Sequence, residues 1–533
     1  MRATVRVGTS TCGLATGAEA TYVALQEAAS DLGLEIFVQR TGCLGACHRE
    51  PLVEIVTDGA HVLYGPVTGD RARPLLEGHF MLHGASPPPQ EWIVSRTADR
   101  RDYPYFASQI KVTTRNCGAI DPRSLDDYLA AGGYEGLRCA LAISPEAVID
   151  EVKRSKLRGR GGAGFPTGVK WEICRRQPDP IRYLVCNADE GDPGAFMDRT
   201  VIEGDPHRVL EGMAIAAHAI GAHLGYVYVR AEYPLAVRHL EAAIEQAREA
   251  GYLGTNILGS GLNFDVIVRE GAGAFVCGEE TALMQSIEGK RGVPRMRPPY
   301  PAESGLWGHP TNINNVETYA SIPDIMTRGG EWFAGLGTAD SGGTKTFALT
   351  GAVRLTGLIE VPIGITLRDV IFGIGGGIRE GRSFKAVQIG GPSGGCLSAS
   401  HLDTPVDYGP LRATGAIMGS GGMVVVDDHT CMVDLARYFL QFTQSESCGK
   451  CVPCRIGTRK MLGILTRITR GEGRADDIER LEQVAQTVRT ASLCGLGLTA
   501  PNPVLTTLRY FRHEYEAHVH DRTCPAGACA GSR

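Results

Sequence analysis

Apolar and polar positions along the first 85 residues follow the periods of β-strands and of one helix. The segments ATVRVG, EIFVQR, VEIV and HVLYG have the short apolar runs of strands, and EATYVALQEAASDLG has the spacing of a helix that ends at Gly33. This β-α-β-β order predicts a small thioredoxin-like α/β domain over residues 1–85. The run ASPPPQEW near residue 85 indicates a linker.

Residues 100–330 alternate between apolar strands and amphipathic helices. YLVCNADE predicts a strand that runs into an acidic loop, YVYVRAEYP and FDVIV predict further strands, and PLAVRHLEAAIEQAREAG predicts a helix that stops at Gly251. This alternation is typical of a Rossmann-like α/β domain that binds nucleotides.

The rest of the chain changes character twice. Residues 331–425 are rich in glycine and contain the short strands TKTFALTGAV, KAVQIGG and MVVVD, which predicts a β-grasp-like domain. Residues 426–512 have helical periodicity and predict a helical bundle, followed by a tail over residues 513–533. The pattern as a whole predicts an α/β multidomain protein.

Four cysteines of the helical segment have the spacing of an iron–sulfur site. Cys448, Cys451 and Cys454 form C-x2-C-x2-C, and Cys494 follows Cys454 after 40 positions. A cubane 4Fe–4S cluster needs four thiolates, and a loop with a cysteine at every third position supplies three of them. The alternative is zinc, but zinc sites usually combine two C-x2-C pairs, so the pattern favours the cluster.

A glycine-rich loop, RGRGGAGFPTGVKW, runs from Arg158 to Trp171. It matches G-x-G-x-x-G, but the preceding SPEAVIDEVKRSKL looks helical, whereas the dinucleotide fingerprint requires a strand there. It is no Walker A loop either, since Trp171 follows Lys170. Closely spaced glycines still allow main-chain N–H groups to approach a phosphate or a ring, with Arg160 and Lys170 balancing its charge. A mobile glycine turn is the alternative.

Polar residues cluster in three further loops. Asn187, Asp189 and Glu190 follow a predicted strand, where α/β sheets bind ligands, although a solvated acidic turn has the same composition. Glu279 and Glu280 are equally ambiguous, because helix N-termini favour acidic residues in any case. Asn314 and Asn315 suit either cofactor-binding amides or a turn.

Composition excludes several classes of protein. The 533-residue chain has a net charge of -5 and a pI near 6.3, so it lacks the basic signature of a nucleic-acid-binding protein. No apolar run approaches the roughly 20 residues that span a bilayer, and MRATVRVGTS lacks the apolar region of a signal peptide. Sixteen cysteines then favour metal ligation in a reducing compartment, and we expect a cytoplasmic protein.

Several motifs resemble one protein family over roughly residues 105–500. GRGGAGFPTGVKW, CNADEGDPG, GAGAFVCGEETALMQSIEG, RPPYPAESGLWGHPTNINNVET and ESCGKCVPCRIGTRKM with SLCGLG resemble the flavin-bearing, NADH-oxidising subunit of respiratory complex I. They resemble equally its soluble relatives in NAD-dependent formate dehydrogenases and in NAD-linked or electron-bifurcating hydrogenases. The resemblance implies FMN, NAD(H) and one 4Fe–4S cluster, with hydride passing between NADH and the flavin and single electrons passing to the cluster.

Site residues follow from the resemblance position by position. It implies that FMN is held by Gly159, Arg160, Gly161, Gly162, Gly164, Lys170, Asn187, Asp189, Glu190, Asn314, Asn315 and Thr318. Phe165 and Glu280 would hold the adenosine of NADH, with Glu279 beside them. Arg297 and Tyr300 stand where relatives often have lysine and phenylalanine, and Asp192 replaces a common glutamate near the nicotinamide beside Glu190. An acidic group near the ribose favours NAD over NADP.

The N-terminal domain has an incomplete cysteine set. It resembles the thioredoxin-like 2Fe–2S fold, which uses C-x4-C with C-x3-C. Cys43 and Cys47 match the second pair, but Gly17 stands at the fifth position after Cys12. Two interpretations stay open, a degenerate docking domain without a cluster and a 2Fe–2S domain with an unidentified fourth ligand.

The C-terminal tail carries His518, Cys524 and Cys529 in EAHVHDRTCPAGAC. Two thiols and a histidine suit zinc, and Cys431 could be a fourth ligand. Unligated thiols are the alternative.

These expectations describe an FMN-dependent NADH:acceptor oxidoreductase (diaphorase) subunit of a soluble complex. Its expected partners are a thioredoxin-like 2Fe–2S subunit and an iron–sulfur catalytic subunit of the formate dehydrogenase or hydrogenase type. Two alternatives remain, an electron-transfer scaffold that has lost its flavin and the NADH-oxidising subunit of respiratory complex I. The fused N-terminal domain argues by analogy against ordinary membrane complex I.

Overall fold

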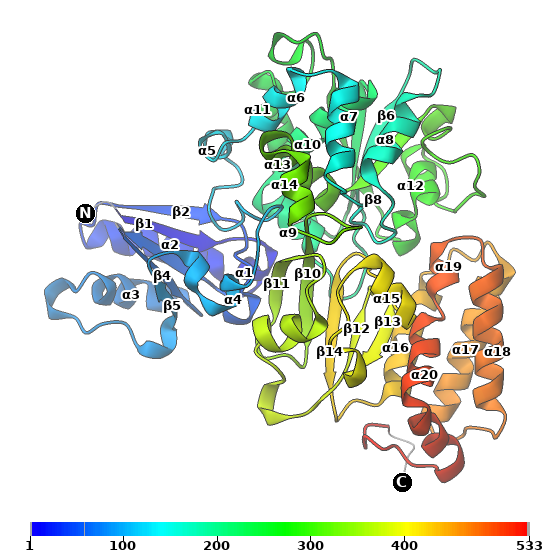
Figure 1. Cartoon of the computed structure of the whole chain (residues 1–533). Coiled ribbons are helices and arrows are strands. Elements are labelled where there is room, and N and C mark those ends of the chain that lie inside the picture. Colours follow the sequence, from blue (N-terminus) through cyan, green and yellow to red (C-terminus); the bar gives the residue numbers. More distant parts are fainter. Residues whose placement is uncertain (1–2, 58, 530–533) are drawn as a thin grey trace.

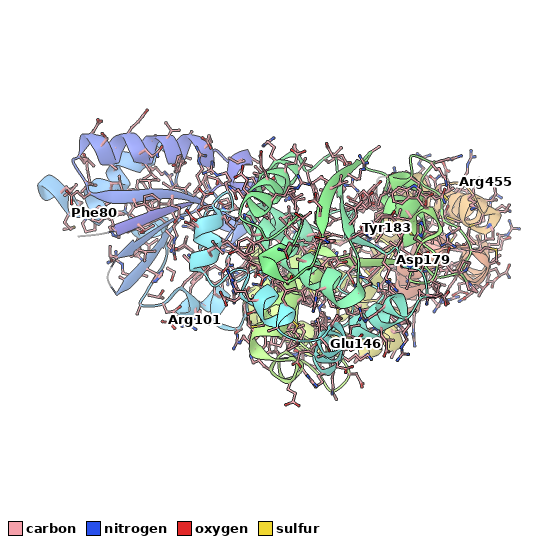
Figure 2. The ribbon with its side chains drawn as sticks, turned by 90° about the horizontal axis from the view of Figure 1, so that it is seen from above. Phe80, Arg101, Glu146, Asp179, Tyr183 and Arg455 are labelled. Carbon is pink, nitrogen blue, oxygen red and sulfur yellow. The ribbon has the colours of Figure 1, made fainter. Side chains whose placement is uncertain are left out.

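The fold, taken from a computed structural model, consists of three β-sheet units and a helical unit that follow one another along the chain (Figure 1). The structure describes residues 3–57 and 59–529. Seen from above, Phe80 of the first unit and Arg455 of the helical unit lie near opposite ends of the molecule (Figure 2).

The first unit is a five-stranded sheet in the order β2-β1-β3-β4-β5. Strands β1 and β2 pair in parallel, because helix α2 connects them, and the other pairs are antiparallel. Its elements are β1 (Ala3–Gly8), α1 (Thr11–Ala15), α2 (Ala18–Asp31), β2 (Ile36–Thr41), β3 (Val53–Thr57), β4 (Ala60–Tyr64), α3 (Ala72–His79) and β5 (Ile93–Thr97). The sheet therefore continues past the predicted linker, since the chain returns after its three prolines and pairs β5 with β4.

The second unit is built around the parallel sheet β8-β7-β6-β9, and α4 (Pro104–Ala107) lies in the connection that leads to it. Its strands are β6 (Tyr183–Ala188), β7 (Leu224–Arg230), β8 (Asp265–Gly271) and β9 (Thr311–Asn315). Its helices are α5 (Leu125–Ala130), α6 (Glu135–Leu141), α7 (Pro145–Arg154), α8 (Thr167–Arg175), α9 (Met197–Gly204), α10 (Pro206–Ile220), α11 (Pro234–Glu249), α12 (Glu280–Ile287), α13 (Val316–Arg328) and α14 (Gly330–Gly335). Helix α7 occupies the segment before the glycine loop, as its periodicity predicted.

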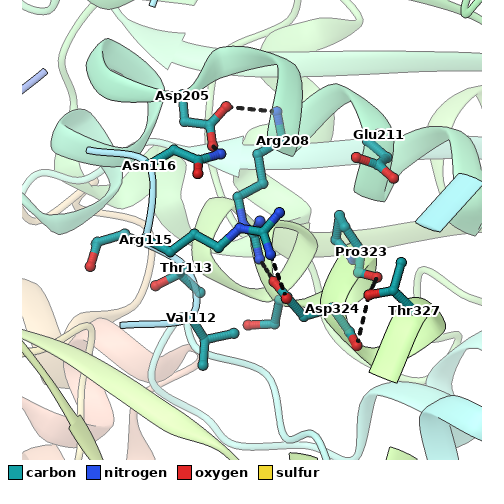
Figure 3. A network of polar contacts seen from close by, with 12 residues as sticks. Val112, Thr113, Arg115, Asn116, Asp205, Arg208, Glu211, Pro323, Asp324 and Thr327 are labelled. Carbon is teal, nitrogen blue, oxygen red and sulfur yellow. Dashed lines mark hydrogen bonds and ion pairs between the residues drawn. The ribbon is translucent and has the colours of Figure 1, made fainter. Parts of the chain in front are cut away.

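A buried ion network joins α10 and α13 on this unit. Arg208 of α10 is fully buried and pairs with Asp324 of α13, which also accepts a hydrogen bond of 2.9 Å from Arg115 (Figure 3). Asp205 caps α10 and accepts a hydrogen bond of 2.7 Å from Asn116. Because α13 begins directly after Asn315, this network fixes the helix that leads away from the predicted flavin site.

The third unit is the mixed sheet β11-β10-β14-β12-β13. Its elements are β10 (Thr344–Gly351), β11 (Gly357–Pro362), β12 (Phe384–Ile389), β13 (Gly395–Ser398), α15 (Tyr408–Thr414) and β14 (Gly422–Asp427). A short π-helical turn forms over Asp369–Ile374, where glycines follow closely.

The helical unit packs α16 against α17 and α20. Its elements are α16 (Met432–Ser445), α17 (Val452–Thr469), α18 (Asp477–Ala491), α19 (Gly495–Thr499) and α20 (Asn502–Glu516). Among the described residues, no helix is long and apolar enough to cross a membrane.

Candidate functional site

The four predicted cluster ligands surround one small pocket of the helical unit. Cys448 and Cys451 lie in the loop between α16 and α17, Cys454 is in the first turn of α17, and Cys494 directly precedes α19. The pocket is lined by these cysteines and by Val276, Pro294, Ser447, Lys450, Leu493 and Leu496. Four thiols facing a largely apolar pocket suit a 4Fe–4S cluster, whose thiolate ligands they would be.

The cluster pocket is tied to the second unit through residues 275–294. The main-chain N–H of Phe275 donates to Glu446 at 2.9 Å, and Arg291 donates to the carbonyl of Cys448 at 3.3 Å. The same segment contains Glu279 and Glu280. The predicted nucleotide loop and the cluster loop are therefore in direct contact.

The glycine loop approaches its neighbours too closely for side chains. Gly164 has φ +67°, and a Cβ there would lie 2.4 Å from the ring of Tyr408, whose hydroxyl donates to the carbonyl of Gly159 at 2.9 Å. Gly161 lies against Asn315, and Gly162, at φ +119°, lies against Gly419. The glycines bring the loop close to the carboxyl end of the parallel sheet.

The side chain of Arg160 is fully buried and bonds to main-chain carbonyls. Its guanidinium donates to the carbonyls of Arg158 and Gly342 at 2.9 and 2.7 Å, and its main-chain N–H donates to Thr318 at 2.9 Å. Arg160 thus stabilises the main chain of the loop, and its hydrogen bond to Thr318 joins the loop to α13. These bonds occupy the guanidinium of Arg160, so within this segment the main-chain N–H groups and the Lys170 ammonium are the better candidates to bind a phosphate.

Amides from two neighbouring strands meet at the sheet edge. The parallel register places Cys186 of β6 beside Asn314 of β9, and Asn187 beside Asn315. Asn314 accepts hydrogen bonds from Trp171 and Asn312, which orients its amide. Its buried Nδ2 has no hydrogen-bond partner among the described residues, so it is a donor available to a ligand. The Lys170 ammonium reaches the same edge, where it donates to the carbonyl of Ile313 at 2.6 Å.

Asp189 places an unsatisfied carboxylate in this region. The residue is 8% exposed, and within the described part of the chain neither carboxylate oxygen has a hydrogen-bond partner. The nearest cation, Arg230, lies at 4.0 Å from Oδ1. Burial raises the pKa of Asp189 to about 7. A ligand with hydroxyl groups would suit both residues, because a hydroxyl can donate to this carboxylate and accept from the free Nδ2 of Asn314.

Glu190 is held by the start of α9. Its carboxylate accepts from the main-chain N–H groups of Asp198 and Arg199 at 3.1 and 3.2 Å, and Tyr233 donates to its carbonyl at 2.9 Å. Burial raises its pKa. The position of Glu190 is therefore fixed before any ligand binds.

Asp192 reaches across to the third unit. It accepts a hydrogen bond from Ser420 and lies against Gly391. Burial raises its pKa to about 6. Asp192 thus links the acidic loop after β6 to the glycine-rich turns of the third sheet.

The predicted adenosine site lies on a more exposed surface. Phe165 and Tyr300 are 47% and 53% exposed, and the Glu280 carboxylate forms an ion pair with Arg297. Glu279 instead caps α12, because its carboxylate accepts from the main-chain N–H groups of Thr281 and Ala282, both at 3.0 Å. An exposed aromatic ring and an acidic group are both suited to bind the adenosine part of a nucleotide.

The three N-terminal thiols lie together at the contact between the first and second units. The Cys47 thiol lies next to the thiols of Cys12 and Cys43. Arg199 of α9 donates to the Cys12 sulfur at 3.6 Å. The spacing alone could not show that this group borders the helix that holds Glu190.

The C-terminal residues also converge, as a zinc site would require. The ligand atoms of Cys431, His518, Cys524 and Cys529 all lie within 4.8 Å of one another. The Cys431 sulfur is 3.6 Å from His518 Nε2, and His518 Nδ1 bonds to the carbonyl of Glu514 at 2.7 Å. A main-chain acceptor on the far ring nitrogen orients a histidine for metal binding.

Sequence reasoning missed several polar partners of the predicted site. Arg230 and Tyr233 come just after or at the end of β7, the strand next to β6, so the rule that ligands bind at the carboxyl ends of parallel strands could have identified them. No sequence rule pointed to Asp198 or Ser420. Asp198 accepts a hydrogen bond from Asn315 at 2.5 Å.

Comparisons with known proteins identify related domains and chains. Residues 152–324 match the family described as the Nuo51 FMN-binding domain, and residues 434–518 match the NADH-ubiquinone oxidoreductase-F iron-sulfur binding region. The NADP-reducing hydrogenase subunit HndC of Solidesulfovibrio fructosivorans is 59% identical over 79% of this chain and 86% of its own. One F-type subunit of the NADH-quinone oxidoreductase of Rhizobium meliloti is 48% identical over 78% of this chain and 99% of its own.

A solved structure extends the match. The crystal structure of an NAD+-reducing [NiFe]-hydrogenase in the H2-reduced state aligns with a TM-score of 0.69 and 33% identity, over 97% of this chain and 84% of that chain. The chain therefore belongs to the family of FMN- and iron–sulfur-binding subunits of NADH oxidoreductases, and it is an FMN-dependent NADH dehydrogenase subunit with a 4Fe–4S cluster.

Proposed function

We propose that the chain serves a hydrogen-linked complex outside the membrane rather than a quinone-reducing one. This proposal rests on how much of this chain each relative matches. The Rhizobium protein is matched over 99% of its length, yet about a fifth of this chain lies outside that match, whereas the NAD+-reducing hydrogenase covers 97% of it. The expected partners are a hydrogenase-type iron–sulfur subunit and a thioredoxin-like 2Fe–2S subunit; a formate dehydrogenase partner stays a prediction.

Affinity purification of the tagged chain from its own cells, without oxygen, tests this. We expect hydrogenase-type subunits to co-purify and the complex to reduce NAD+ with H2. Co-purification with quinone-reducing membrane subunits, together with NADH oxidation that needs a quinone, would refute the proposal. The chain has sixteen cysteines, and those in the described residues form no disulfide, which favours a reducing compartment; we propose the cytoplasm.

We further propose the finer domain assignments. The parallel β1–β2 pair with antiparallel neighbours supports a thioredoxin-like first unit, and the four parallel strands support a Rossmann-like FMN and NADH unit. The mixed third sheet supports a β-grasp-like unit, followed by the helical cluster unit.

The residues at the site support a specific division of work. When bound, FMN accepts hydride from NADH and returns electrons singly, which is chemistry that the protein does not need to supply. The main chain of the glycine loop and Lys170 would hold the phosphate, while Asp189 and Asn314 would accept from and donate to the polar chain. Preformed contacts keep Glu190 and Asp192 in place near the nicotinamide, so binding costs little reorganisation.

We propose NAD(H) rather than NADP(H) as the favoured nucleotide. Glu280 would repel a 2′-phosphate, although its ion pair with Arg297 places a cation nearby, and the HndC relative is named as NADP-reducing. Glu280→Gln should lower the kcat/KM preference for NADH over NADPH by about tenfold, which corresponds to about 1.4 kcal/mol. Equal activity of the unmodified protein with both nucleotides would contradict this proposal.

We propose that Cys431, His518, Cys524 and Cys529 hold a structural zinc ion. Three thiols and one imidazole form a closed ligand set of the usual structural type. Metal analysis should find about one zinc per chain, and Cys431→Ser should lose it while flavin and iron stay. Cys139→Ser, at an exposed position of α6, is the matched control. A protein without zinc, or a Cys431→Ser variant that keeps it, would refute the site.

A further inference from the structure

The Glu50 carboxylate lies between the two segments that carry the N-terminal thiols. Its Oε1 is 3.8 Å from the sulfur of Cys43, and its Oε2 accepts from the main-chain N–H of Leu52 at 2.9 Å. A Cβ on Gly13, the residue after Cys12, would lie 3.3 Å from the same Oε2. The Glu50 carboxylate therefore lies against helix α1, which carries Cys12, and beside the Cys43–Cys47 loop.

The surroundings of Glu50 contain no cation that would explain this position. Among the described residues, the carboxylate has no ion-pair partner, although the residue is only partly exposed. Gly8 and Gly13 leave room for it, since a Cβ at either position would contact its oxygens. A partly buried carboxylate beside three thiols, without a cation, is an arrangement that a metal centre would satisfy.

The geometry suits two metal ions better than one. In a tetrahedral centre with metal–sulfur and metal–oxygen distances of about 2.3 and 2.1 Å, the two ligand atoms lie about 3.6 Å apart, close to the Cys43–Glu50 separation. Within the described ranges, only the C-terminal group of histidine and cysteine residues has all its ligand atoms within 4.8 Å of one another, as a site for a single metal ion requires. The N-terminal groups are more widely spread: Cys47 lies next to Cys12 and Cys43, and Cys43 lies next to Glu50, which is the spread that a binuclear centre requires.

We propose that Cys12, Cys43, Cys47 and Glu50 together hold a 2Fe–2S cluster, with the Glu50 carboxylate replacing the cysteine that is missing at Gly17. The Arg199 guanidinium, which donates to the Cys12 sulfur, would offset part of the negative charge of this centre. The same residue donates its main-chain N–H to Glu190. The N-terminal centre thereby borders the flavin site through a single residue of α9, and it offers electrons a second route out of the subunit.

Iron content and EPR of the full-length protein, purified and reconstituted without oxygen, test the ligand assignment. We expect about six irons per chain and, after reduction, a 2Fe–2S signal beside that of the 4Fe–4S cluster. Glu50→Gln should lower the count to about four and remove only the 2Fe–2S signal. Glu50→Cys should restore both, with a visible spectrum that shows the additional thiolate. Glu27→Gln, at an exposed position of α2, is the matched control and should keep all six irons.

Two outcomes would overturn the proposal. The first is an unmodified protein with about four irons and no 2Fe–2S signal, which would make the first unit a domain without a cluster. The second is a Glu50→Gln variant whose iron count and EPR spectrum equal those of the unmodified protein, which would assign the fourth ligand elsewhere. Retained FMN and 4Fe–4S signals in every variant separate loss of this ligand from misfolding, and from failure of the hydrogenase assignment.

Discussion

Replacing Asp189 by asparagine should change stability and flavin binding in opposite directions. The carboxylate is 8% exposed and has no hydrogen-bond donor in the described part of the chain, and burial raises its pKa from 3.8 to about 7. The folded protein therefore binds this proton more tightly than the unfolded chain does. As the pH rises from about 4 to about 7, the stability of the flavin-free protein falls. Above that range, the full destabilisation from ionising the buried Asp189 is present.

The size of this cost follows from the pKa. At 1.36 kcal/mol for each pH unit, the change from 3.8 to about 7 corresponds to about 4 kcal/mol at pH 8, and to about 1.6 kcal/mol at pH 5. Asparagine also buries polar atoms, so we expect Asp189→Asn to stabilise the flavin-free protein by about 2–4 kcal/mol at pH 8. For a unit of this size, that raises Tm by about 5–15 °C.

Flavin binding should respond in the other direction. Asparagine loses a charged acceptor, and hydrogen bonds to charged groups contribute about 1.5–3 kcal/mol each, so Kd for FMN should rise about 10- to 100-fold. Thermal melts of deflavinated protein at pH 5 and pH 8, with fluorescence titration of FMN, measure both effects.

Asp205→Asn is the matched control for this experiment. Its buried carboxylate accepts from Asn116 and caps α10, and burial raises its pKa to about 6, so this change alters a second buried carboxylate and should leave flavin affinity unchanged. An Asp189→Asn variant that melts lower at pH 8, or that binds FMN as the unmodified protein does, would refute the reasoning.

Three other predictions test the scaffold. Gly164→Ala should abolish FMN retention, because the position combines a positive φ with a Cβ contact of 2.4 Å; Gly159→Ala, whose nearest Cβ contact is 3.6 Å, should retain FMN, and equal loss in both would contradict the geometry. Cys494→Ala should remove about four irons while NADH still reduces the flavin; a retained 4Fe–4S EPR signal would exclude this ligand. Asp324→Asn should cost about 3–5 kcal/mol, since it leaves the buried Arg208 without its ion-pair partner; an unchanged Tm would show that the network contributes little.

Local patterns predicted those parts of the site that lie close together in sequence. The Cys448–Cys454 loop needs only its own spacing, and helix α7 before the glycine loop was enough to reject a dinucleotide fingerprint. Asn187 and Asn315 were separate candidates along the chain, and the parallel pairing of β6 with β9 brings them side by side. The cause is the regularity of parallel sheets, which collect the carboxyl ends of their strands at one edge.

Contacts between distant segments were not predictable in the same way. Ser420 binds Asp192 across 228 positions, and neither residue belongs to a pattern that names the other. Glu50 looked like an ordinary residue of a turn, because its relation to Cys12 exists only after β1 and β3 have paired. Glu279 shows the reverse case, since an acidic residue before a helix was equally consistent with a cap, and the structure gives it that role.

The convergence of Cys431 and Cys529 has a consequence for how long the cluster survives. The two sulfurs lie 3.6 Å apart although 98 positions separate them in the chain, so a zinc ion bound there closes the helical unit into a ring. Closing a loop of about 100 residues removes chain entropy worth about 4–5 kcal/mol from the opened state. The segment after α20, which carries His518 and Cys524, lies at the end of the bundle opposite α19, and α19 follows the last cluster ligand (Figure 1). Removing this zinc ion with a chelator should therefore shorten the lifetime of the iron–sulfur cluster at the other end of the helical unit.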